Sequence, residues 1–93
     1  MIKVLIKSEA NDYISLIEVD RVTYYEPTNN AIPPEKLKYL TLGCDRYAFH
    51  KDTVSNYTRV LKTLSCIHSS QYRLDIIINI KEEILRVEAT LLE

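Results

Sequence analysis

The chain contains a single glycine, Gly43, among its 93 residues. Loops that hold phosphate groups need several glycines, because only a residue without a Cβ atom lets the backbone approach a ligand closely. The sequence therefore excludes a Walker loop, a dinucleotide-binding fingerprint, a nucleophile elbow and a glycine-rich kinase loop. No other catalytic or metal-binding constellation takes their place. We expect a protein that is not an enzyme and that binds no cofactor or metal.

The length limits the chain to one globular domain, residues 1–93, with a single core. Its composition, 46% apolar and 27% charged, is typical of a soluble globular protein. A domain of 10.9 kDa buries about two-thirds of its unfolded surface, so we expect shallow binding sites and no deep cleft.

The N-terminal segment and the cysteines bear on localisation. Residues 1–7 contain apolar residues interrupted by lysine and no small-residue cleavage site, so we interpret them as a first strand and not as a signal peptide. Cys44 and Cys66 fit no metal-binding spacing, and we expect free thiols in a reducing cytoplasm.

The first part of the chain has the pattern of an antiparallel strand pair. Residues 2–7 alternate between two faces, and residues 13–25 are rich in β-branched residues and tyrosine. The alternation slips near Asp20 and Arg21, which indicates a bulge or a second, short strand.

The region that follows allows two interpretations. Residues 26–36 form a proline-rich loop. We favour a helix over residues 34–42 that ends at Gly43, because Pro33 and Pro34 suit a first helical turn. The alternative is a strand over residues 37–42, joined by a turn to a strand over residues 46–50, which we expect in either case.

An amphipathic helix over about residues 53–66 is the clearest element, with Asp52 or Thr53 as its N-cap. We place Leu61 at the centre of its apolar face. The predicted apolar face contains Val54, Tyr57, Val60, Leu61, Leu64 and Ile67, and the polar face contains Ser55, Asn56, Arg59, Lys62 and Thr63.

The C-terminal part, residues 72–92, is predicted to form a strand followed by either a helix or the second strand of a hairpin, because residues 82–93 fit both periods. The predicted fold class is therefore α+β, with a small antiparallel sheet packed on one face by the helix at about 53–66.

Charge is unevenly distributed along the chain. Residues 46–73 contain five Lys or Arg against one Asp, whereas residues 74–93 contain two against five acidic residues. A basic segment attracts anionic partners and steers their approach. Tyrosine is enriched at protein interfaces, and the adjacent pair Tyr24 and Tyr25 cannot both point into a core. The candidate contact residues are Arg46, His50, Lys51, Arg59, Lys62, Arg73, Tyr24 and Tyr25.

Nucleic acid is one candidate partner of this segment. Aromatic residues lie among its charges, at Tyr47, Phe49, Tyr57 and Tyr72, as in proteins that stack single-stranded bases. The order of strands, helix and His68-x-Ser70 loosely resembles a LytTR-type DNA-binding domain, although Cys66 stands where that family has an arginine. The pI of about 6.1 favours a protein partner, since nucleic-acid-binding modules are usually strongly basic.

The expected function is non-enzymatic binding of an acidic macromolecule, a protein rather than nucleic acid, with no role at a membrane. Small cytoplasmic inhibitors and adaptors of viruses and mobile elements have this size and composition. His50 with Asp52, and His68 with Ser69 and Ser70, are interpreted as surface and turn residues and not as catalytic groups. We also expect a homodimer, because a small sheet is predicted to have free edges.

Overall fold

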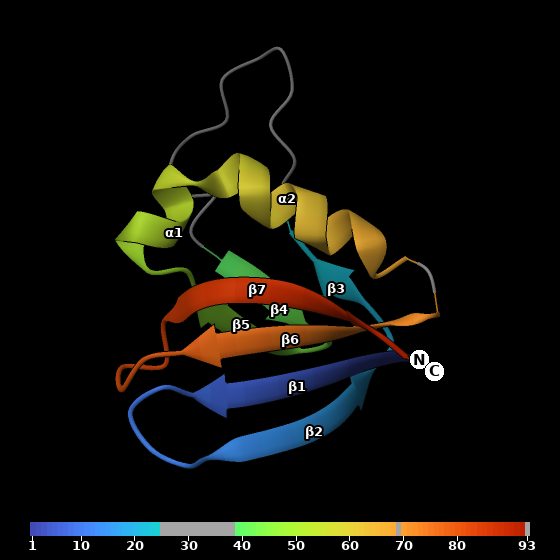
Figure 1. The fold of residues 1–93 in the computed structure, drawn as a ribbon, viewed down its shortest axis with the longest axis horizontal. Helices are drawn as coiled ribbons and strands as arrows, with labels where there is room; N and C mark the ends of the chain where they lie inside the picture. Colours follow the sequence, from blue (N-terminus) through green and yellow to red (C-terminus); the bar gives the residue numbers. More distant parts are fainter. Residues whose placement is uncertain (25–38, 69, 93) are drawn as a thin grey trace.

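The computed structural model describes residues 1–24, 39–68 and 70–92. These residues form a mixed α+β fold with seven strands in two sheets and two helices (Figure 1). None of the described helices is long and apolar enough to cross a membrane. In chain order the elements are β1 (Ile2–Ser8), β2 (Ile14–Val19), β3 (Val22–Thr23), β4 (Tyr39–Leu42), β5 (Asp45–Ala48), α1 (Lys51–Ser55), α2 (Tyr57–Cys66), β6 (Tyr72–Ile78) and β7 (Ile84–Leu91).

The larger sheet has the strand order β2-β1-β6-β7. The predicted antiparallel pair of β1 and β2 is confirmed, with Ile2 opposite Val19 and Lys7 opposite Ile14. β1 and β6 are parallel, so the expectation of a purely antiparallel sheet is wrong. The alternating pattern of β1 specified its two faces, but such a pattern carries no information about the direction of a neighbouring strand.

The smaller sheet is antiparallel, with the order β3-β4-β5. Residues 39–42 are the strand β4, so the favoured helix over 34–42 is wrong there, and residues 34–38 lie outside the described part. Gly43 has a φ of +61°, which serves a tight turn between β4 and β5 and not a helix end. Its amide donates to the carbonyl oxygen of Arg21 at 2.9 Å, which ties this turn to the link between β2 and β3.

The predicted helix over 53–66 is two helices that meet at Asn56. Helix α1 begins at Lys51 because His50, and not Asp52 or Thr53, is the N-cap: Nδ1 of His50 accepts from the amide of Asp52 at 3.2 Å. Thr53 is instead buried, and its hydroxyl lies 2.9 and 2.7 Å from the carbonyl oxygens of Ile84 and Leu85 at the start of β7.

The core lies between the two sheets and α2. Val4, Leu74 and Ile76 from the larger sheet are fully buried, as is Leu64 from α2. Leu61 only packs against the edge of this core and is half-buried, so its predicted central position is wrong. The buried side of α2 is centred on Val60 and Leu64, about one residue around the helix from the predicted centre at Leu61.

Residues 72–92 form the hairpin β6–β7, which decides between the two alternatives for this segment. Val87 is buried, whereas Arg86 and Glu88 on either side of it are exposed, so the alternation follows the period of a strand. The register shifts at Leu85, because Ile84 is opposite Ile78 and Arg86 is opposite Ile77. This irregularity lets Ile84 and Val87, three positions apart, both be buried, which is why the segment also fitted the period of a helix.

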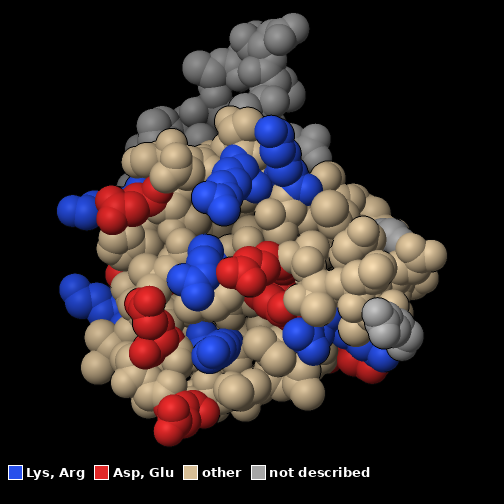
Figure 2. All heavy atoms as spheres, in the orientation of Figure 1, with Lys and Arg blue, Asp and Glu red and all other residues tan. Residues whose placement is uncertain are grey.

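One face of the larger sheet is open. In Figure 1 the smaller sheet lies behind the larger one, and neither helix crosses its front face. The register places Leu5, Leu16, Asp75 and Glu88 in one row across this face. Figure 2 views the same face, where acidic side chains gather near the centre with basic side chains around them.

Candidate functional site

A groove of about 500 Å³ runs between the two helices and β7. We call it the α2–β7 groove. Thr53 anchors α1 to the start of β7, and α2 packs beside the same strand, so the two helices form one wall and β7 forms the other. Its ionisable lining residues are Glu9, His50, Asp52, Arg59, Arg86 and Glu88.

Most charges of the groove already have partners. Nε of Arg86 donates to Oε1 of Glu88 at 3.0 Å. His50 is held by its capping bond, and its Nδ1 lies 3.6 Å from the carboxylate of Asp52. His50 therefore caps α1, and Asp52 lies in the first turn of this helix, whereas His50 was expected at the end of the strand over residues 46–50.

Two of these lining residues, Glu9 and Arg59, have side chains without such a partner among the described residues. Lys62 follows Arg59 along α2. The side chains of Arg59 and Lys62 are exposed, and neither forms a hydrogen bond or ion pair with any described residue. They lie three positions apart, so they share one face of the helix. Basic side chains (blue) over α2 are visible in Figure 2. We call Arg59 and Lys62 the basic pair of α2.

The remaining candidate residues are distributed over several surfaces. Lys51 is exposed on α1, close in the chain to the groove. Arg46 belongs to β5 in the smaller sheet, where its guanidinium lies 4.2 Å from the ring centre of Tyr39. Arg73 lies on the open face, paired with Asp75.

The tyrosine pair is only partly described. Tyr24 is half-buried, and its hydroxyl lies 3.2 Å from Nε2 of His68. Tyr25 lies outside the described residues. The structure thus brings His50, Lys51, Arg59 and Lys62 to the helices beside the groove, and it places Arg46, Arg73 and Tyr24 elsewhere.

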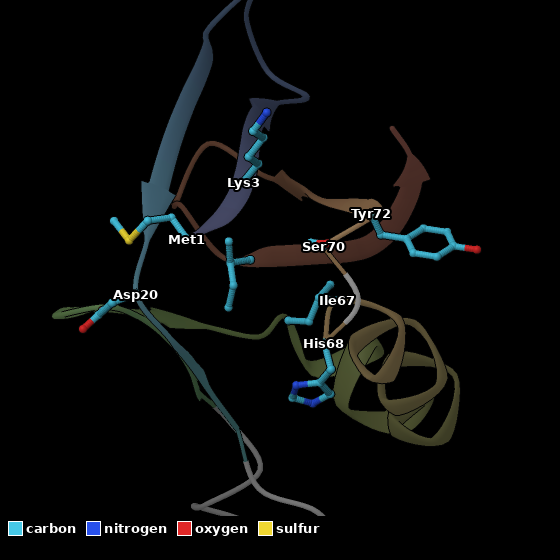
Figure 3. Close-up of a pocket in the computed structure, with 8 residues that line it drawn as sticks. Met1, Lys3, Asp20, Ile67, His68, Ser70 and Tyr72 are labelled. Atoms are coloured by element: carbon cyan, nitrogen blue, oxygen red, sulfur yellow. The ribbon is translucent and has the colours of Figure 1, made fainter. Parts of the chain in front are cut away.

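A second cavity, of about 360 Å³, lies beside the N-terminus and the end of α2. Figure 3 shows that Lys3 and Tyr72 carry their polar ends away from it, and that Ile67 contributes to its wall. Polar groups do not converge on this cavity, which argues against a catalytic role. Among the described residues no group of three His, Cys, Asp or Glu side chains is placed to hold a metal ion.

Two sets of surface residues were not predicted from the sequence. Arg86 and Glu88 line the groove, but they come from β7, whose strand structure was left open. Ile14 and Leu16 are exposed on the open face, at 57% and 69% of their surface. Their strand has apolar residues on both faces, a pattern that usually indicates burial on both sides; here β2 is an edge strand instead.

Comparison of the chain with protein-family models, with curated proteins and with solved structures gives no match.

Proposed function

We propose that this chain is a non-enzymatic binding protein, an inhibitor or adaptor, that engages an acidic surface of another protein. The basic pair of α2 makes the main contact, and the α2–β7 groove receives neighbouring side chains of the partner. The observation that carries the proposal is that Arg59 and Lys62 are exposed and unpaired within the described structure. A basic pair that serves only the fold would be expected to form ion pairs with acidic side chains.

The lining of the groove favours a protein over nucleic acid. Glu9, Asp52 and Glu88 place carboxylates beside Arg59. These carboxylates would repel a phosphate backbone, whereas a protein surface can present both signs of charge to them.

The aromatic residues support the same preference. Phe49 and Tyr57 are only 4% and 6% exposed, and their rings pack edge to face at 5.9 Å inside the core. Two of the four aromatic residues considered for base stacking are therefore not available to a ligand. The nucleic-acid alternative therefore keeps only two of the four aromatic residues that suggested it.

The proposal is tested by affinity capture from an extract of the native cell with the wild-type protein and the variant Arg59→Glu/Lys62→Glu. We expect the wild type to retain a specific acidic protein and the variant to lose it. Exposed substitutions of this kind change the free energy of unfolding by about 0.5 kcal/mol or less, so the variant should remain folded.

A matched control is Arg21→Glu/Lys81→Glu, which makes the same change of charge at two exposed residues outside the groove. This control should capture the same protein as the wild type. Equal capture by all three proteins would refute the proposed site. Retention of DNA or RNA at low salt, with no protein retained, would support the nucleic-acid alternative instead.

A further inference from the structure

The outer edge of β2 is an uncapped strand edge. β2 is the last strand of the larger sheet, and no described element pairs with its outer side. Natural edge strands usually carry lysine, proline or a bulge that prevents pairing with another chain. β2 has six residues, Ile-Ser-Leu-Ile-Glu-Val, with none of these features and with Glu18 as its single charge.

The backbone of β2 shows which residues point outward. The amide of Ser8 donates to the carbonyl oxygen of Tyr13 at 3.0 Å, and these two residues are opposite each other in the register of β1 and β2. Bonded and non-bonded pairs alternate along an antiparallel ladder. Ser15 and Ile17 therefore bond to β1, while the N–H and C=O groups of Ile14, Leu16 and Glu18 are directed away from the sheet.

The other strand edges in the described part of the chain are partly covered or short. At the opposite edge of the larger sheet, Ile84 at the start of β7 accepts hydrogen bonds from the amide of His50 and the hydroxyl of Thr53, and α2 packs beside this strand. The edge strands of the smaller sheet, β3 and β5, have only two and four residues. Among the described strands, β2 thus has the long edge that no element covers. Pairing of this edge with its copy around a twofold axis would leave neither copy of it free, so the pairing would not extend into a filament.

We propose that β2 pairs antiparallel with β2 of a second copy of this chain, centred on Leu16. This register pairs Leu16 with Leu16 and Ile14 with Glu18 of the other copy, and so uses the three outward-directed residues of β2 and no others. The two four-stranded sheets become one continuous sheet, and both smaller sheets remain on the same side of it.

The charges favour a second copy in this register. On the open face Lys7 is the neighbour of Ile14, and Lys3 is the neighbour of Glu18. In the dimer each Glu18 has its own Lys3 on one side and Ile14 of the other copy on the other side. Lys7 of the other copy lies one strand beyond that Ile14. A register shifted to pair Glu18 with itself would place two carboxylates opposite each other, which is unfavourable.

The first test is the mass of the wild-type protein in solution, measured by sedimentation equilibrium over a range of concentrations. We expect a species of twice the 10.9 kDa chain mass at high concentration. Amide hydrogen exchange then identifies the edge: in the dimer the amides of Ile14, Leu16 and Glu18 should be protected, and on dilution they should become exposed. The amides of Ser15 and Ile17 should be protected in both states.

Two variants separate dimerisation from folding. Leu16→Pro removes an amide that makes no bond within the chain, so the pairing of β1 and β2 should survive while dimerisation is lost. Leu16→Lys keeps the amide but places two lysines opposite each other, and it should weaken the dimer by about tenfold or more. The control Lys81→Glu, far from β2 in the chain, should dimerise like the wild type.

A wild-type protein that stays monomeric at all concentrations would overturn the proposal. So would a dimer in which the amides of Ile14, Leu16 and Glu18 exchange freely, or one that Leu16→Pro and Leu16→Lys leave intact. These outcomes do not depend on the basic pair of α2, and capture of a protein partner by that pair is measured separately.

Discussion

Nε of Arg73 donates to Oδ1 of Asp75 at 2.6 Å on the open face of the larger sheet, and a second bond of 3.2 Å joins the two side chains. Asp75 also accepts from the hydroxyl of Thr90, and it is only 8% exposed although none of the described elements covers this face. Its hydrogen bond raises the pKa of the Arg73 guanidinium above its ordinary value. The basic residue at the end of the segment 46–73 is thus part of a polar network on the sheet.

We predict that Arg73→Ala lowers the free energy of unfolding by about 1–3 kcal/mol, because it leaves a buried carboxylate with one partner fewer. The double variant Arg73→Ala/Asp75→Ala should be less destabilised than the sum of the two single variants. Urea denaturation of the four proteins measures this coupling. Additive effects would show that the two side chains do not stabilise each other.

Leu64→Ala should be the most damaging truncation in α2. Leu64 is fully buried, and removing a side chain of this kind typically costs about 2–5 kcal/mol. Leu61→Ala should cost less than about 2 kcal/mol, because Leu61 keeps part of its surface in water in the folded state. Thermal unfolding of both variants tests the order, and a larger loss for Leu61→Ala would mean that α2 is rotated in solution.

Thr53→Val should lower the free energy of unfolding by about 1–2 kcal/mol, since it removes the hydroxyl that bonds to the start of β7. Ser55→Ala on the exposed side of α1 is the control, because its hydroxyl bonds only to the carbonyl of Lys51 in its own helix. That variant should change stability by about 0.5 kcal/mol or less. Equal effects in chemical denaturation would contradict a role of Thr53 in joining α1 to the sheet.

Tyr47 should make the fold sensitive to alkaline pH. Burial raises the pKa of its phenol, and the charges of Asp45 and Glu82 raise it further. The folded state therefore holds this proton more tightly than the unfolded state, in which the phenol titrates at about pH 10. The stability from this group is complete below that pH, and it is lost as the pH rises toward the higher pKa of the folded state.

Denaturation midpoints measured at about pH 9, 10 and 11 should therefore fall with rising pH. Tyr47→Phe has no phenol to ionise, so its midpoint should fall less over the same range. An identical decline in the wild type and the variant would assign the alkaline sensitivity to other groups.

Local patterns in the sequence predicted the elements whose partners are close in the chain. The β1–β2 hairpin and the helix near 53–66 were found because their apolar residues repeat with the period of one structure. Gly43 was misinterpreted because a left-handed residue suits both a helix end and a hairpin turn, and the pairing of β4 with β5 on its two sides distinguishes them.

The candidate site was predictable only in part, because several of its contacts join residues that are distant in the chain. The sequence predicted that Arg59 and Lys62 lie together on the polar side of a helix. It could not show that Arg73 has a buried carboxylate as partner while Arg59 has none, because that depends on which strands are neighbours. The exposed β2 edge was likewise not predicted, since β2 lacks the lysine or proline that usually marks an edge strand in a sequence.

The parallel pairing of β1 with β6 has a consequence for how this chain reaches its structure. β1 is synthesised before β6, yet it stays unpaired on one side until a strand that begins at Tyr72 reaches it. Contacts so distant in the chain close late, because the loop between them must lose its entropy first. We therefore expect β1 and β2 to form an early hairpin, and the docking of β6 beside β1 to limit the folding rate.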